Sequence, residues 1–166
     1  MNKESAYQVC TTRDEVYACI KNKASYLNCL PFRTFLNQMV EQGKKSFVVD
    51  FRDCTSMDST FLGILVGLAL ELRKHKEKGQ LTLVNLMGRN LETVQNLGIH
   101  KIATVSSGLI SNPKQLENLN SDPSNIETTT EIVYQAHKTL LELNEKNSRI
   151  FSDVVHYLEQ KIEDSS

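Results

Sequence analysis

The sequence lacks the features that mark several large classes of protein. Its four cysteines are scattered, with no C-x-x-C pair, and its four histidines are equally dispersed, so no metal site is expected. No apolar run approaches the roughly 20 residues of a membrane span, and residues 1–5 hold no apolar signal-peptide core. We therefore expect a cytoplasmic protein, not bound to a membrane, with reduced and mostly buried thiols.

The sequence also has little excess charge and few glycines. Lys and Arg number 19 against 20 Asp and Glu, and this net charge of -1 argues against nucleic-acid binding, which needs a basic surface. The seven glycines form neither a P-loop nor a dinucleotide fingerprint, and there is no G-x-S-x-G elbow. We therefore predict no cofactor, no catalytic residues and no enzymatic activity.

Before residue 110, apolar runs alternate with amphipathic stretches. Short runs rich in β-branched and aromatic residues predict strands at 7–10, 16–20, 46–51, 81–86 and 102–105. Apolar residues at steps of three and four predict helices at 32–40, 62–72 and 91–97. The first two strands suit a hairpin. The alternation that follows predicts an α/β fold with a mixed, mostly parallel sheet covered by helices.

The length of 166 residues suits one domain with an appendage. We divide the chain into a domain at 1–110, a linker at 111–122 and an amphipathic helical extension at 123–164. A helix that begins at Pro123 and breaks within 144–148 fits the spacing of apolar residues in the extension. Three alternatives remain: a helical pair packed on the domain, a coiled coil that binds a partner or forms a homodimer, and a disordered tail.

The most informative segment, residues 50–63, runs from the end of a buried strand to the start of an apolar helix. Between them we expect a polar loop at 52–57. Asp58, Ser59 and Thr60 then bring small side-chain oxygens to a helix N-terminus, where backbone N–H groups lack partners within the helix. By itself, this pattern is typical of plain capping by Asp58 or Ser59.

The order of elements around this segment resembles the STAS domain family, specifically the bacterial anti-sigma factor antagonists. Their signature is a buried strand ending in Asp, a short loop, an Asp-Ser-(Ser/Thr)-x-Leu-Gly element that opens a helix, and a further strand. Residues 48–51 (VVDF) match the strand, and residues 57–63 (MDSTFLG) match the element. The resemblance covers residues 7–107 and implies a STAS-like fold, to which the extension is an addition.

The resemblance implies a switch between protein partners. In this family, the Ser of the Asp-Ser pair is phosphorylated by an anti-sigma factor that is also a GHKL-type serine kinase, and here that residue is Ser59. The unphosphorylated protein would bind this kinase and free a sigma factor, and a PP2C-type phosphatase would restore that form. A phosphate on Ser59 would add about 1.5 to 2 negative charges to a surface that carries Asp58 and Asp53, and so repel a docked partner.

The neighbours of Ser59 have their own interpretations. Asp58 either caps the helix or orients the Ser59 hydroxyl during phosphotransfer. Thr60 offers a second hydroxyl, so it is a weaker candidate for phosphorylation and a possible partner contact. Phe61 stands where many family members have a small residue. We expect Phe61 to change the surface beside Ser59 and thereby the choice of partner.

A second segment is expected at the same end of the sheet. In the family fold, the loop at 25–28 lies beside the phosphorylated serine, so the resemblance implies that Ser25 and Asn28 contact the partner. The alternative is an ordinary loop in which Asn28 caps the following helix. For the whole chain, the alternative function is a non-catalytic scaffold or signalling-complex subunit that assembles through its C-terminal helix, with Ser59 only a helix cap.

Overall fold

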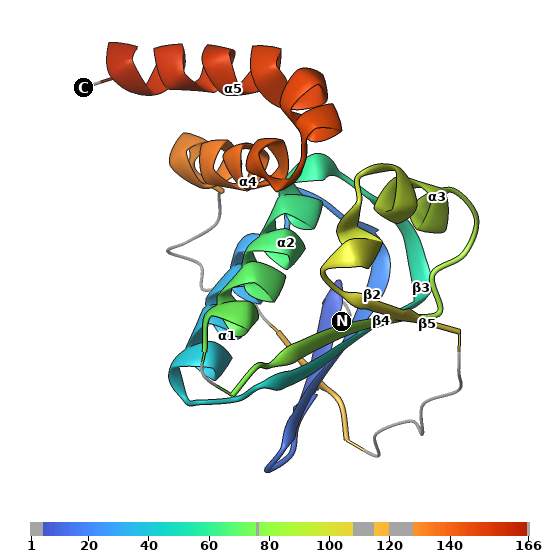
Figure 1. The fold of residues 1–166 in the computed structure, drawn as a ribbon. Helices are drawn as coiled ribbons and strands as arrows, with labels where there is room; N and C mark the ends of the chain where they lie inside the picture. Colours follow the sequence, from blue (N-terminus) through green and yellow to red (C-terminus); the bar gives the residue numbers. More distant parts are fainter. Residues whose placement is uncertain (1–4, 76, 108–114, 120–127, 166) are drawn as a thin grey trace.

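The chain is seen in a computed structural model that describes residues 5–75, 77–107, 115–119 and 128–165. Within these ranges, six strands form one sheet in the order β5-β4-β3-β2-β1-β6 (Figure 1). The strands are β1 (Tyr7–Thr11), β2 (Glu15–Ala24), β3 (Ser46–Met57), β4 (Gln80–Val84), β5 (Thr104–Ser106) and β6 (Glu117–Asn118). β2 to β5 run parallel, whereas β1 is antiparallel to β2 and β6, so the predicted mixed, mostly parallel sheet is confirmed.

The helices cover one face of this sheet and one end of the domain (Figure 1). They are α1 (Leu30–Glu41), α2 (Ser59–Lys74), α3 (Gly88–Asn96), the 3-10 turn η1 (Ile99–Lys101), α4 (Thr130–Leu143) and α5 (Glu145–Asp164). Phe47, Val49 and Phe51 alternate along the central strand β3 and are buried in one core with Phe61 and Leu65 of α2. Burial of such apolar surface is the main favourable contribution to folding.

β3 continues to Met57, so the polar loop predicted at 52–57 is wrong. Its last residues pair with the end of β2, where Ala24 lies opposite Met57, whereas β4 ends opposite Asp50. The two strands therefore project beyond the sheet, and most side chains of β3 there are exposed, which explains their polar sequence. The pairing at this end of β2 has two register irregularities, and Asn22 there has a φ of 63°. The projection sets the loop after β2 beside the start of α2.

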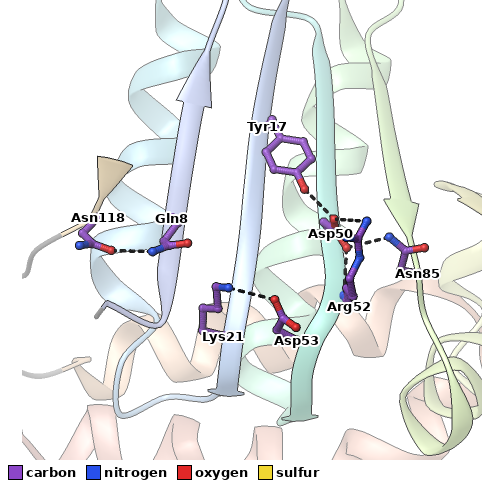
Figure 2. A network of polar contacts seen from close by, with 8 residues as sticks. All are labelled: Gln8, Tyr17, Lys21, Asp50, Arg52, Asp53, Asn85 and Asn118. Carbon is purple, nitrogen blue, oxygen red and sulfur yellow. Dashed lines mark hydrogen bonds and ion pairs between the residues drawn. The ribbon is translucent and has the colours of Figure 1, made fainter. Parts of the chain in front are cut away.

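A buried carboxylate lies on the other face of the sheet (Figure 2). Asp50 is 3% exposed and accepts hydrogen bonds from the Tyr17 hydroxyl at 2.6 Å, the Asn85 side-chain amide at 2.9 Å and the Arg52 backbone N–H at 2.9 Å. Burial alone would raise the pKa of Asp50, but these bonds outweigh it and hold the pKa below its usual range. Burial, together with the bond to Asp50, raises the pKa of Tyr17 well above its usual value.

The C-terminal extension forms two helices that pack on the domain. α4 begins at Thr130, and the Thr129 hydroxyl caps it by accepting the backbone N–H of Ile132 at 3.2 Å. The start predicted at Pro123 lies outside the described residues. Asn144 ends α4 and caps α5, so the predicted break is confirmed. α4 lies across α2, and α5 lies against α4 (Figure 1), which is the helical pair among the three alternatives.

The segment 111–122, interpreted as a linker, contains part of the sheet. Its residues 117–118 form β6, and the Gln8 side-chain amide donates a hydrogen bond to the Asn118 side chain at 3.1 Å (Figure 2). β1 is therefore paired on both sides and is not an edge strand. In the described parts of the chain, none of the helices combines the length and the apolar character that crossing a bilayer requires.

Candidate functional site

Ser59 is the first residue of α2 and comes directly after the end of β3 and Asp58. Asp58 is the N-cap, because its Oδ1 accepts the backbone N–H of Phe61 at 2.9 Å. Its Oδ2 accepts the backbone N–H of Tyr26 at 2.8 Å and so ties the loop between β2 and α1 to the start of α2. The interpretation of Ser59 as only a helix cap is therefore wrong, and its hydroxyl serves another contact.

Asp58→Ala is expected to lower the free energy of unfolding by about 1–2 kcal/mol, because it removes the cap of α2 and the tie to the loop together. Asp58→Asn is the matched control. Its side-chain oxygen can still accept the bond from Phe61, so it should lose much less. Urea-induced unfolding followed by circular dichroism measures both. Equal losses in the two variants would contradict the capping role.

The segment 25–28 is organised by Asn28. The Asn28 Oδ1 accepts hydrogen bonds from the Tyr7 hydroxyl at 2.8 Å and from the Ser25 backbone N–H at 3.0 Å. Burial raises the pKa of Tyr7 well above its usual value, so its hydroxyl stays a donor at neutral pH. The N-cap position of α1 is occupied by Cys29, so the interpretation of Asn28 as the cap is wrong.

This loop turns two apolar side chains outward. Tyr26 is 50% exposed and Leu27 is 72% exposed. Ser25 and Asn28, the residues predicted to meet a partner, hold the loop in shape, and the Ser25 hydroxyl accepts the backbone N–H of Leu27 at 3.2 Å. Sequence reasoning singled out this loop but not its two outward residues, although an adjacent Tyr and Leu in a polar loop were a readable signal.

Thr60 and Phe61 point into the domain. Phe61 is 0% exposed, and its ring stacks with those of Tyr7 and Phe32 at centroid distances of 6.3 and 5.9 Å. The expectation that Phe61 shapes the surface beside Ser59 is therefore wrong. Thr60 is 3% exposed, so in the folded protein its hydroxyl suits neither phosphorylation nor contact with a partner.

The Ser59 hydroxyl meets a histidine from the extension. Its Oγ lies 2.7 Å from Nε2 of His137 on α4. Nδ1 of the same ring lies 2.7 Å from the Val133 carbonyl, which can only accept, so Nδ1 carries a proton. In the neutral ring, Nε2 then accepts a hydrogen bond from the Ser59 hydroxyl. His137 is 6% exposed and packs edge-on against Phe151 of α5. No sequence pattern joins residues that lie 78 positions apart.

A pocket of about 410 Å³ lies beside this contact. It is bounded by the loop after β2, the start of α2 and both helices of the extension, and its lining includes Tyr26, Asp58, Ser59, His137 and Lys161. Asp53, expected to add negative charge here, forms a salt bridge with Lys21 at 2.9 Å (Figure 2). The charge of Asp53 is therefore paired with Lys21, and Asp58 is the carboxylate directly beside Ser59.

Two of the thiols, those of Cys29 and Cys54, are held in their protonated form. Burial raises the pKa of the Cys29 thiol and raises that of Cys54 to about 11, so neither is a thiolate at neutral pH. Across the described residues, His, Cys, Asp and Glu form no group of three or more that could hold a metal ion.

A comparison with protein families decides the family. The family described as "Mlab, STAS domain" matches residues 24–110, which is more than half of the chain. The chain belongs to the STAS domain family. The match runs from the last residue of β2 through α1, β3, α2, β4, α3 and β5. It leaves α4 and α5 of this STAS protein outside.

Solved structures show the same fold. The STAS protein is similar to the anti-sigma factor antagonist SpoIIAA in its unphosphorylated form, at 20% identity and a TM-score of 0.53, over 63% of this chain and 90% of that one. It is also similar to the phosphorylated form of SpoIIAA, the Bacillus cell fate determinant. The identity is 20% and the TM-score 0.52, over 61% of this chain and 92% of that one. An anti-sigma factor antagonist from Mycobacterium paratuberculosis is similar at 14% identity and a TM-score of 0.51, over 62% of this chain and 86% of that one. No curated protein sequence matches significantly.

Proposed function

We propose that this STAS protein is an anti-sigma factor antagonist switched by phosphorylation of Ser59. Its unphosphorylated form binds an anti-sigma factor that is also a GHKL-type serine kinase and thereby frees a sigma factor. The observation that carries the proposal is the position of Ser59 at the start of α2, beside a loop that exposes Tyr26 and Leu27. Exposed apolar side chains next to a hydroxyl at a helix N-terminus form a surface that a partner can both bind and modify.

The chemistry needs no catalytic group on this chain. The kinase transfers the γ-phosphoryl group of ATP to the Ser59 oxygen. The new O–P bond replaces the bond to the leaving ADP, and the hydroxyl proton passes to the kinase. The phosphate meets free N–H groups and the positive end of the α2 dipole, which stabilise it on the chain. A PP2C-type phosphatase returns the hydroxyl and releases inorganic phosphate by hydrolysis.

The switch acts at the interface and requires no refolding. A phosphate adds about 1.5 to 2 negative charges beside Asp58, where a docked partner meets new bulk and like charge. A loss of a few kcal/mol of binding free energy weakens binding by about a hundredfold or more. In this scheme the chain is a substrate and a binding partner, and it acts in signal transduction that regulates transcription.

A second candidate rests on α5, where Ile150 is 50% exposed and Tyr157 is 57% exposed. These side chains suit a non-catalytic subunit that assembles a signalling complex or a homodimer through its C-terminal helices. In that case, changes at Ser59 leave partner binding unaffected. The same binding experiment therefore separates the two candidates.

Ser59→Ala is expected to keep binding to a GHKL-type serine kinase from the native host, and Ser59→Asp is expected to weaken that binding by about a hundredfold. Ser56→Asp is the matched control, since Ser56 is exposed on the same projecting strand and adds the same charge away from the Ser59 hydroxyl. Pull-down followed by surface plasmon resonance measures the affinities. Identical binding of the Ala and Asp variants would contradict the proposed function and favour assembly through α5.

A further inference from the structure

The face of α2 that begins at Ser59 is covered by the extension. Gly63, one turn after Ser59, lies against the backbone of α4. A methyl group in place of its hydrogen would come within 2.7 Å of the Ala136 Cα atom. Gly67, one turn further along α2, has open space around it. Gly63 therefore permits a close crossing of two helices that a larger residue would prevent.

The residue after Ala136 reaches the phosphorylation candidate itself. His137 holds the Ser59 hydroxyl at 2.7 Å, and Leu140, one turn later on α4, is 0% exposed within the domain core. A kinase has to bring the γ-phosphate of ATP in line with the same hydroxyl oxygen. α4 lies across the start of α2 and the imidazole of His137 engages that hydroxyl, so both restrict the approach of a kinase.

The extension also holds the domain at two further places. The Thr128 hydroxyl, just before α4, donates a hydrogen bond to the Tyr26 carbonyl in the loop after β2. At the junction of α4 and α5, the side-chain amides of Asn144 and Asn147 donate to the Leu97 carbonyl at 3.1 and 2.9 Å. The extension thus contacts the loop and the start of α2, which lie beside Ser59, and it is also held at the turn after α3.

We propose that α4 and α5 form an intramolecular cover that occupies the partner-facing end of the STAS domain and withholds Ser59 from its kinase until the cover is displaced. This inference rests on the proposed function of Ser59. The cover and the kinase compete for one surface. The phosphorylation rate is therefore proportional to the fraction of molecules in which that surface is open. Among the residues that the structure describes, the Asn147 Oδ1 is buried and has no hydrogen-bond partner, a cost of the closed state that opening relieves.

Gly63→Ala in the full chain is the direct test, because its methyl group acts as a wedge between α2 and α4. Gly67→Ala is the matched control: it makes the same change on the same helix, and nothing lies within 4 Å of the added atom. Hydrogen exchange of α4 amides reports release of the cover, and the rate of Ser59 phosphorylation by the purified GHKL-type kinase with ATP reports access. We expect Gly63→Ala to raise both by about tenfold or more, and Gly67→Ala to raise neither.

A second variant tests whether the effect of Gly63→Ala comes from release of α4 and not from a disturbance of α2 itself. Leu140→Asp places a charge on the buried face of α4 and leaves the sequence of α2 unchanged, so it should release the cover in the same way. Fast exchange in α4 with an unchanged phosphorylation rate in both variants would overturn the cover while leaving the proposed function standing. Absence of phosphate on Ser59 in every variant would overturn the proposed function, and the cover with it.

Discussion

Phe61→Ala is expected to lower the free energy of unfolding by about 3–5 kcal/mol, the range for removing a fully buried aromatic side chain. The ring is 0% exposed and lies among three others. It stacks on Tyr7 and Phe32, and it meets Phe51 edge-on at a centroid distance of 6.3 Å. Removing it leaves a cavity where α1, α2, β1 and β3 meet, and the surrounding rings can fill that cavity only in part.

The controls separate this core role from a role at the surface. Phe61→Leu keeps most of the buried apolar volume and is expected to lose clearly less stability than the alanine variant. Ser59→Ala, two residues away, leaves the aromatic cluster intact and removes only the hydrogen bond to His137, so it should lose about 1 kcal/mol. Urea-induced unfolding measures all three. A loss below about 1 kcal/mol for Phe61→Ala would contradict the burial of this ring.

Asp50→Ala is expected to lower the free energy of unfolding by about 2–4 kcal/mol. The substitution leaves the Tyr17 hydroxyl, the Asn85 amide and the Arg52 backbone N–H without their acceptor on the face of the sheet opposite the helices (Figure 2). Tyr17→Phe is the matched control, because it removes one donor and leaves Asp50 with its other partners. It should lose about 1 kcal/mol. Equal losses of unfolding free energy in the two variants would contradict the role of Asp50 as the acceptor of three hydrogen bonds.

The same carboxylate gives the protein an acid-sensitive component of stability. The folded state holds the pKa of Asp50 below its usual range, so the ionised form is bound more tightly in the folded than in the unfolded chain. The stabilisation is therefore complete above the unfolded pKa of about 4 and is lost as the pH falls through the lower folded value. The stability difference between wild type and Asp50→Asn should shrink over that interval. A difference that is constant from neutral pH downward would contradict the shift.

Most of the fold could be predicted because it depends on local periodicity. The runs at 46–51 and 81–86 are short, apolar and β-branched, and the helix at 32–40 repeats at three and four residues. The end of β3 could not be predicted this way. Residues 52–57 are polar and form a strand only because the end of β2 pairs with them outside the sheet. That pairing is a long-range interaction with no local signature.

The candidate site also has one part that the sequence predicts and one part that only the tertiary structure reveals. Ser59 was placed by the Asp-Ser-Thr pattern at the end of a buried strand, which is a local signal. Phe61 was misplaced, although its helical phase with Leu65, Leu68 and Leu72 was readable as one buried face. His137 belongs to a helix that folds back on α2, so only the tertiary structure brings it to Ser59. The region that decides access to Ser59 is therefore the region that sequence describes least.

The measurement that tests the central claim most directly is phosphorylation-site mass spectrometry on the protein purified from its native host, with growth in several conditions. The account predicts phosphate on Ser59, in a fraction that varies with the growth condition, and no phosphate on Thr60, which is 3% exposed. Phosphate that maps to another residue, or an unmodified Ser59 in every condition, would contradict it. An unmodified Ser59 would leave α5 as the surface where a function has to be sought, whereas phosphate on another residue would move the switch to that residue.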